Sequence, residues 1–156
     1  MRLEGSAGQH LELHLAAYQF MGTPQEGDGF DWDANWLVIE GEAKDGSRSW
    51  AFRDPCLLTS EARELAAWLA AVAGGQTGIE AIDFTEPNLE FRRMSLPGEQ
   101  PVVRVTFRLE SRSPWAPDPY EDDQWDACWL EFETSAANLR VAAEELLSEL
   151  ERFPER

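Results

Sequence analysis

Positively charged side chains are scarce in this sequence. Its 156 residues include 13 lysines and arginines against 30 aspartates and glutamates, and Lys44 is the single lysine. The formal net charge of −17 excludes unaided binding to a phosphate backbone, because counterion release requires clustered lysine and arginine. The same charge repels an anionic membrane surface. The sequence therefore predicts neither direct nucleic-acid binding nor membrane binding.

Long apolar runs are also absent. No window approaches the roughly 18 consecutive apolar residues that a membrane-spanning helix requires. Residues 1–15 carry Glu4, His10, Glu12 and His14 where a signal peptide has its apolar segment. We therefore expect a cytoplasmic protein.

Cysteine occurs only twice, as Cys56 and Cys128, without a CxxC pair or the spacing of a zinc site. Two cysteines in a chain of this length are more typical of reduced, partly buried side chains than of a disulfide framework. This usage agrees with a cytoplasmic compartment.

The motifs of common enzyme classes are missing as well. The chain has no GxSxG elbow, HExxH helix, P-loop or GxGxxG fingerprint. His10 and His14 are four residues apart, so on an extended strand they share one polar face, where solvated histidines are expected. We predict no catalytic residues and no cofactor. A small hydrolase that uses a carboxylate pair remains an alternative, because thirty acids supply many pairs.

One spacing resembles a calcium-binding loop. Asp31, Asp33, Asn35 and Glu42 occupy its positions one, three, five and twelve, but Trp36 stands where the loop needs glycine for a sharp turn. The acidic residues at 121–126 could collect a cation only loosely, because no histidine accompanies them. The sequence therefore predicts no metal site.

Alternation of apolar and polar residues predicts several β-strands. The clearest case is 103–109, and others lie at 10–20, 36–42, 47–53, 79–84, 88–94 and 127–133. The Asp-Gly pair at 45–46 separates two apolar runs and predicts a hairpin. Residues 21–31 contain four glycines or prolines among polar residues, which predicts a loop.

Two segments change to helical periodicity. Leu65, Trp68, Leu69 and Val72 predict a helix at about 60–73, capped by Thr59 or Ser60, and a second helix is predicted at about 135–152, entered through Thr134 or Ser135. Without a linker or a repeat, residues 1–156 form one domain. We expect an α+β fold in which a curved, mainly antiparallel sheet of about six to seven strands carries both helices on one face.

The acidic residues gather in two stretches that also contain five of the seven tryptophans. Residues 26–45 have a net charge of −6, and residues 114–133 have a net charge of −7. Aromatic side chains among carboxylates are typical of a protein-binding surface, because the rings provide buried area and the charges select a basic partner. The predicted contact residues are Trp115, Asp118, Tyr120, Glu121, Asp122, Asp123, Trp125 and Asp126, followed by Asp28, Asp31 and Trp32.

The same stretches have a simpler interpretation as solvated loops whose charge serves solubility. Trp36 and Trp129 alternate with apolar neighbours, so we expect these two rings in the core. The two interpretations therefore differ in the role of the other tryptophans and the carboxylates around them, which form either an interface or a solvated surface.

Four short motifs carry a family resemblance: D-x-N-W-L from Asp33, D-P-x-L-L-T from Asp54, E-P-N-L-x-F from Glu86 and F-P-E-R at 153–156. With them the chain resembles the WapI family of bacterial immunity proteins over most of its length. The resemblance implies a cytoplasmic partner that neutralises the toxic C-terminal domain of a large secreted polymorphic toxin, a tRNA-cleaving nuclease in the best known case. It implies no catalytic residues.

The leading hypothesis is therefore a non-catalytic inhibitor that binds a basic toxin nuclease with an acidic, tryptophan-containing surface that imitates the charge of RNA. The alternatives are a housekeeping α+β domain with a solubilising surface and the carboxylate-dependent hydrolase. The sequence does not distinguish occlusion of the active site from binding elsewhere on the toxin.

Overall fold

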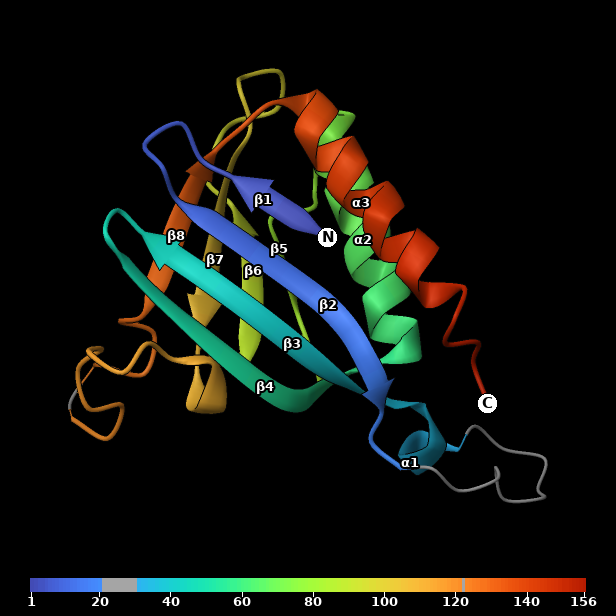
Figure 1. The fold of residues 1–156 in the computed structure, drawn as a ribbon. Coiled ribbons are helices and arrows are strands. Elements are labelled where there is room, and N and C mark those ends of the chain that lie inside the picture. The colour runs from blue at the N-terminus through green and yellow to red at the C-terminus, as the bar shows by residue number, and fades with distance from the viewer. Residues whose placement is uncertain (21–30, 122) are drawn as a thin grey trace.

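Two four-stranded antiparallel sheets and two long helices make up the fold (Figure 1). The computed structural model describes residues 1–20, 31–121 and 123–156. The predicted loop at 21–31 therefore lies almost entirely outside the described residues. The first sheet has the order β1-β2-β3-β4 and the second has the order β5-β6-β7-β8. The bounds are β1 Arg2–Glu4, β2 His10–Tyr18, β3 Trp36–Asp45, β4 Arg48–Leu58, β5 Ala81–Asp83, β6 Leu89–Arg93, β7 Val102–Phe107 and β8 Trp129–Glu133.

The predicted strands are confirmed where alternation is regular. In β2, Leu11, Leu13 and Leu15 are buried, whereas Glu12 and His14 point outward. The predicted β3–β4 hairpin is also present, with Asp45 opposite Arg48. Its turn needs a left-handed residue, and Gly46 supplies φ +58°.

The expectation of one sheet with six to seven strands is wrong. Helix α2 (Thr59–Ala73) follows β4 directly and carries the chain to β5, so the strands after it build a second sheet. The two sheets face each other: the Phe107 ring of β7 lies 5.1 Å from that of Trp50 and 6.1 Å from that of Phe52 on β4. Alternation identifies the buried face of a strand but not its neighbour, so it could not separate the sheets.

Helices α2 and α3 (Ala136–Leu150) pack against each other and close one side of the space between the sheets (Figure 1). They do not cover one face of a single sheet, as the sequence predicted, because the inward faces of both sheets need the same core. Trp68 of α2, for example, packs edge-on against Phe91 of β6. None of the described helices has the length and apolar composition to cross a membrane.

The helix bounds agree with the prediction within two residues, but one predicted cap is wrong. The Leu58 N–H donates to Glu61 Oε2 (2.8 Å) at the start of α2, while the Thr59 hydroxyl donates to the Asn35 carbonyl. The α3 cap is Ser135, as predicted, and its hydroxyl accepts from Asn138 N (3.1 Å).

Three short elements were not predicted: β1, helix α1 (Trp32–Asn35) and the 3₁₀ turn η1 (Leu109–Ser111).

A buried asparagine joins the C-terminal residues to α1. Asn35 is 0% exposed, and its Nδ2 donates to the carbonyls of Asp31 and Arg156, both at 2.8 Å. Its Oδ1 accepts from Arg156 N (2.9 Å). Tyr18 at the end of β2 completes the junction, because its hydroxyl donates to the Pro154 carbonyl. These contacts join residues of the first and last sequence motifs.

A second buried asparagine joins the two sheets. Asn88 Nδ2 lies 3.3 Å from both Asp54 Oδ2 on β4 and Glu110 Oε2 on η1. The main-chain carbonyl of Asn88 accepts from Arg108 N and from the Ser111 hydroxyl. Burial, together with repulsion from Glu110 and Glu86, raises the pKa of Asp54. The junction therefore disfavours the charge of the Asp54 carboxylate.

Removal of the Asn35 amide should destabilise the whole fold. In Asn35→Ala, the Asp31 and Arg156 carbonyls and the Arg156 N–H lose a buried partner, so the free energy of unfolding should fall by about 2 kcal/mol in urea titrations. Asn138→Ala, at an exposed position of α3, is the control. Equal effects of the two substitutions would contradict the role assigned to Asn35.

The stability contributed by Asp54 should depend on pH. The folded state holds the Asp54 proton to a higher pH than the unfolded state, so ionisation destabilises the fold as pH rises through the raised pKa. Asp54→Asn should therefore be slightly more stable than the wild type at pH 7.5, and the difference should shrink toward pH 5. Asp83→Asn, at an exposed position of β5, is the control. If the stability difference between Asp54→Asn and the wild type grew on acidification, Asp54 ionisation would stabilise the fold, contrary to this prediction.

Candidate interaction surface

The segment between η1 and β8, residues 112–128, contains most of the predicted contact residues and is held by two arginines. Arg112 donates from Nη1 to the carbonyls of Gln124 and Trp125 and from Nη2 to that of Pro117. A single guanidinium therefore spans the segment from one side to the other. We call residues 112–128 the acidic loop.

The second arginine, Arg108, is buried beneath the acidic loop and bridges Glu90 and Asp126. Burial disfavours the charge of Arg108 and Glu90, but the hydrogen bonds and ion pairs between them, together with those of Glu90 with Arg92 and of Arg108 with Asp126, outweigh it. The pKa of Glu90 is therefore lowered and that of Arg108 is raised. Of the predicted contact residues, Asp126 thus has a structural ion pair as well as an exposed side chain.

Three other acids of the loop are exposed and have no cation of their own. Asp118 accepts from Tyr120 N (3.0 Å), and Glu121 and Asp123 extend into solvent. Among the residues that the structure describes, no basic side chain lies within ion-pair distance of these three carboxylates. Asp122 lies outside the described residues. This end of the loop presents uncompensated negative charge.

Aromatic side chains accompany these charges. Tyr120 is 86% exposed, and Trp115 and Trp125 are each about two-fifths exposed. Exposed aromatic rings lose contact with water when a partner covers them, which makes them frequent centres of protein interfaces. The structure therefore brings together the predicted contact residues of this stretch that it describes.

Next to the loop lies a hollow of about 260 Å³, which we call the tryptophan hollow. Its lining comes from the β3–β4 hairpin, from both ends of the acidic loop and from the start of β8. The lining residues are Asp45, Arg48, Trp50, Ser113, Trp115, Ala116, Pro117, Ala127, Cys128, Trp129 and Leu130. Trp115 meets Trp50 edge-on at 5.6 Å.

The expectation that Trp129 is a core residue is wrong, because its side chain is 45% exposed. Cys128, Leu130 and Phe132 point inward from β8, so the same alternation places Trp129 on the outer face with Glu131. Sequence reasoning had this signal but gave more weight to the apolar neighbours. Trp36, predicted in the same way, is half-buried.

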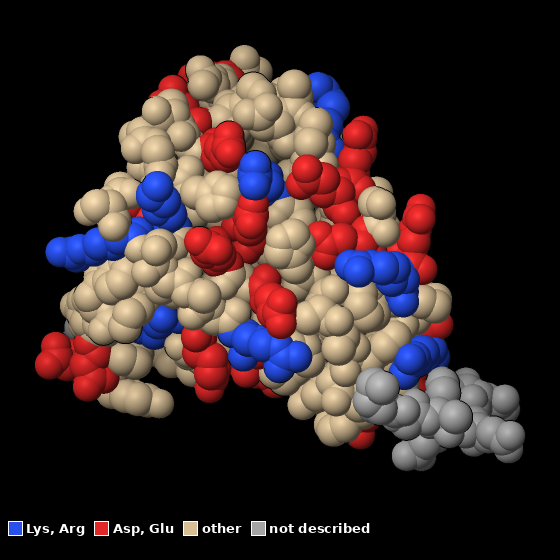
Figure 2. Space-filling view, viewed as in Figure 1, with Lys and Arg blue, Asp and Glu red and all other residues tan. Residues whose placement is uncertain are grey.

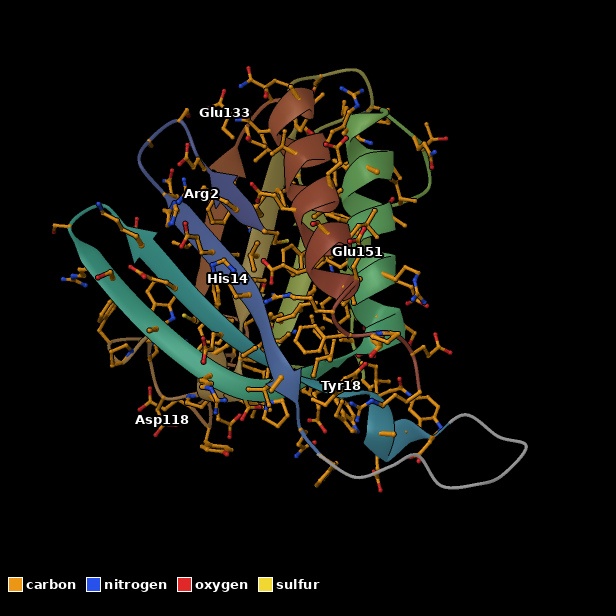
Figure 3. The ribbon with its side chains drawn as sticks, turned by 45° about the vertical axis from the view of Figure 1, so that its right-hand side comes forward. Arg2, His14, Tyr18, Asp118, Glu133 and Glu151 are labelled. Atoms are coloured by element: carbon orange, nitrogen blue, oxygen red, sulfur yellow. The ribbon has the colours of Figure 1, made fainter. Side chains whose placement is uncertain are left out.

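The second predicted stretch lies elsewhere on the molecule. Asp31 Oδ1 accepts from Ala34 N and caps α1, and Trp32 is 57% exposed. In Figures 1 and 3, α1 lies beside the C-terminal residues, whereas the loop carrying Asp118 lies across the sheet from it. The two stretches therefore do not form one continuous surface. Asp28 lies outside the described residues.

Residues of the calcium-like spacing are used differently. Asp31 caps a helix, and the Asn35 side chain is buried in hydrogen bonds to backbone groups. Within residues 1–20, 31–121 and 123–156, no group of three or more histidine, cysteine, aspartate or glutamate side chains is placed to hold a metal ion.

The two histidines lie on the outward face of β2, whereas both cysteines are buried. His10 and His14 flank Glu12 on the outward face of β2, as predicted, and His14 Nδ1 lies 3.0 Å from Glu149 Oε1. Cys56 and Cys128 are buried and free, again as predicted. Burial raises the pKa of the Cys56 thiol to about 12, so this thiol stays protonated. The geometry offers no thiolate–histidine pair between Cys56 and the β2 histidines.

Acidic side chains and arginines are also interspersed on the outward face of β1–β4 (Figure 2). Glu12, Glu40 and Glu42 surround a shallow hollow of about 450 Å³ there. Arg2 hydrogen-bonds Glu12 and lowers its pKa, and Arg53 pairs with Glu40 at 2.9 Å. This face differs from the acidic loop because its lining residues include no exposed aromatic ring.

Comparison with known families identifies the class of protein. The model of the WapI-like immunity protein family matches residues 2–154, so the chain belongs to this family. Membership in an immunity protein family implies that the chain binds a toxin. No curated protein and no solved structure matches the chain significantly.

Loss of the Arg112 clamp should loosen the acidic loop without unfolding the domain. In Arg112→Met, three loop carbonyls lose their shared donor, so backbone amides at 117–125 should exchange hydrogen about tenfold faster. The control Arg63→Met removes an exposed ion pair with Glu155 and should leave the loop unchanged. Unchanged exchange in Arg112→Met would show that the clamp does not hold the loop.

Proposed function

We propose that this protein is a non-catalytic, cytoplasmic immunity protein that binds and neutralises the basic C-terminal nuclease domain of a secreted polymorphic toxin. The observation that carries the proposal is the acidic loop, in which Asp118, Glu121 and Asp123 lack a cation and stand beside exposed aromatic rings. Family membership supports the toxin partner. The charge supports a basic partner, because unpaired carboxylates attract one over several ångströms.

Binding by this surface would neutralise a nuclease through charge attraction and the burial of aromatic side chains. A nuclease that acts on RNA needs positive charge along its substrate groove, since the substrate carries one phosphate per nucleotide. A partner with a net charge of −17 is attracted to the same groove and associates quickly at low salt. The aromatic rings then provide area that is lost from water, which slows dissociation.

No reaction is part of this function. The buried Cys56 thiol and the outward-facing His10 and His14 do not meet, and the carboxylates of the acidic loop are exposed rather than paired across a cleft. Inhibition therefore needs only affinity and a covered toxin surface.

The charge contribution can be tested by titrating the toxin-like domain encoded beside this chain, in calorimetry and in stopped flow. We expect nanomolar affinity that weakens between low salt and about 0.15 M salt. The triple substitution Asp118→Lys, Glu121→Lys and Asp123→Lys should reduce affinity at low salt at least about tenfold, mainly through slower association.

The matched control is Glu64→Lys, Glu144→Lys and Glu151→Lys, which changes the net charge equally at exposed positions of α2, of α3 and just after α3. Glu151 lies on the helical side of the molecule, away from Asp118 (Figure 3). If both triple variants lose the same affinity, only net charge matters and the acidic loop is not the interface. Absence of any binding by the wild type would leave the acidity as a solubility feature.

A further inference from the structure

We infer that the tryptophan hollow is the anchor site of the interface: it receives one large apolar side chain of the toxin domain, from a segment in which lysine or arginine flanks that side chain. This inference rests on the proposed function and adds the recognition element to it. The hollow extends the predicted contact surface to Trp129 and to the hairpin residues Asp45 and Arg48.

The hollow is built on a fixed floor. Trp50 is 8% exposed, and its Nε1 donates to the Ser111 carbonyl (2.9 Å) while its ring packs against Phe107. Trp115 then stands edge-on against Trp50 and keeps 42% of its surface exposed. An incoming apolar side chain therefore meets rings that are already positioned, and little side-chain freedom is lost on binding.

The Trp129 ring is also fixed in position, in this case by an arginine. The Arg104 guanidinium lies 4.4 Å above the centre of its ring, and Arg104 in turn donates twice to Glu131 Oε1 (2.6 and 3.0 Å). Arg48 lies 5.6 Å from the centre of the Trp115 ring. These cation–π contacts occupy one face of each indole with the protein's own arginines. The exposed parts of the Trp115 and Trp129 rings are the apolar surface left for a partner in a hollow whose other lining includes Asp45, Arg48 and Ser113, so an apolar side chain would pack on these two rings.

The charges around the hollow indicate what flanks the apolar side chain. Asp118, Glu121 and Asp123 of the acidic loop follow Trp115 closely in the chain and lack cations, while Arg48 stands opposite Asp45 in the hairpin. Carboxylates beside an apolar centre give the usual arrangement of an interface, with a dry core and a polar rim. Lysine or arginine residues on either side of the anchor would meet these carboxylates.

The sheet face with Glu12, Glu40 and Glu42 is a weaker choice for the anchor site. Its hollow is lined by these carboxylates, which Arg2 and Arg53 partly compensate, and it has no exposed aromatic ring to act as an anchor for a partner. The surface between α2 and β5 has apolar residues but lacks neighbouring tryptophans that remain exposed. The tryptophan hollow has two exposed tryptophan rings and adjoins the acidic loop, so it offers both aromatic surface and negative charge.

The test compares Trp115→Ala and Trp129→Ala with the wild type, with the toxin-like domain encoded beside this chain as the probe. Each substitution should weaken binding at about 0.15 M salt by at least about thirtyfold, mainly through faster dissociation. The salt dependence should stay as in the wild type, because no charge is removed. Leu147→Ala on α3, where the residue is 45% exposed like Trp129, should bind within about twofold of the wild type.

A second measurement avoids substitutions to alanine. The indole N–H resonances of the wild-type protein are assigned with Trp115→Phe and Trp129→Phe, and the probe is then added. Both resonances should shift when the toxin domain binds. The inference is overturned if the wild type binds while neither resonance shifts and both alanine variants keep full affinity, and this outcome leaves the proposed function intact. A wild type that does not bind overturns the proposed function and the inference together.

Discussion

The fold depends on the polar side chain of Asn35 being satisfied without water. Three backbone partners surround this buried amide, two of them on Arg156 and one on Asp31, and the Asn35 carbonyl accepts from Thr59. A buried amide with fewer partners would be unfavourable, so each of these contacts favours the others. Through them the end of the chain, α1 and the start of α2 take one mutual arrangement, and β3 begins directly after it.

Much of this architecture could be predicted because it follows from periodicity. The alternation in β2 and the helical spacing of Leu65, Trp68 and Val72 each report which face of an element is buried. Neither reports which element packs against that face, so a second sheet could not be distinguished from a longer first one. Pro55 illustrates the same limit: it lies inside β4, because this strand is at a sheet edge and needs no partner for the missing N–H.

The surface was predictable in outline for a similar reason. Residues that are close in sequence, such as Trp115, Asp118 and Tyr120, stay close in the loop, so their clustering could be anticipated. The contribution of Trp129 and of the β3–β4 hairpin required the tertiary structure, since these segments are far apart in the chain. The pairing of Asp126 with buried Arg108 also joins separate elements, and composition alone treats this acid like its neighbours.

The origin of the walls of the tryptophan hollow determines how its shape can change. The walls come from two connecting segments, the β3–β4 hairpin and the acidic loop between η1 and β8, and from the first residues of β8. Substitutions in one connecting segment can alter the shape of the hollow while the other segment, and the core beneath both, keep their packing. The shape of the hollow can therefore change while the core and the arrangement of the strands and helices stay the same.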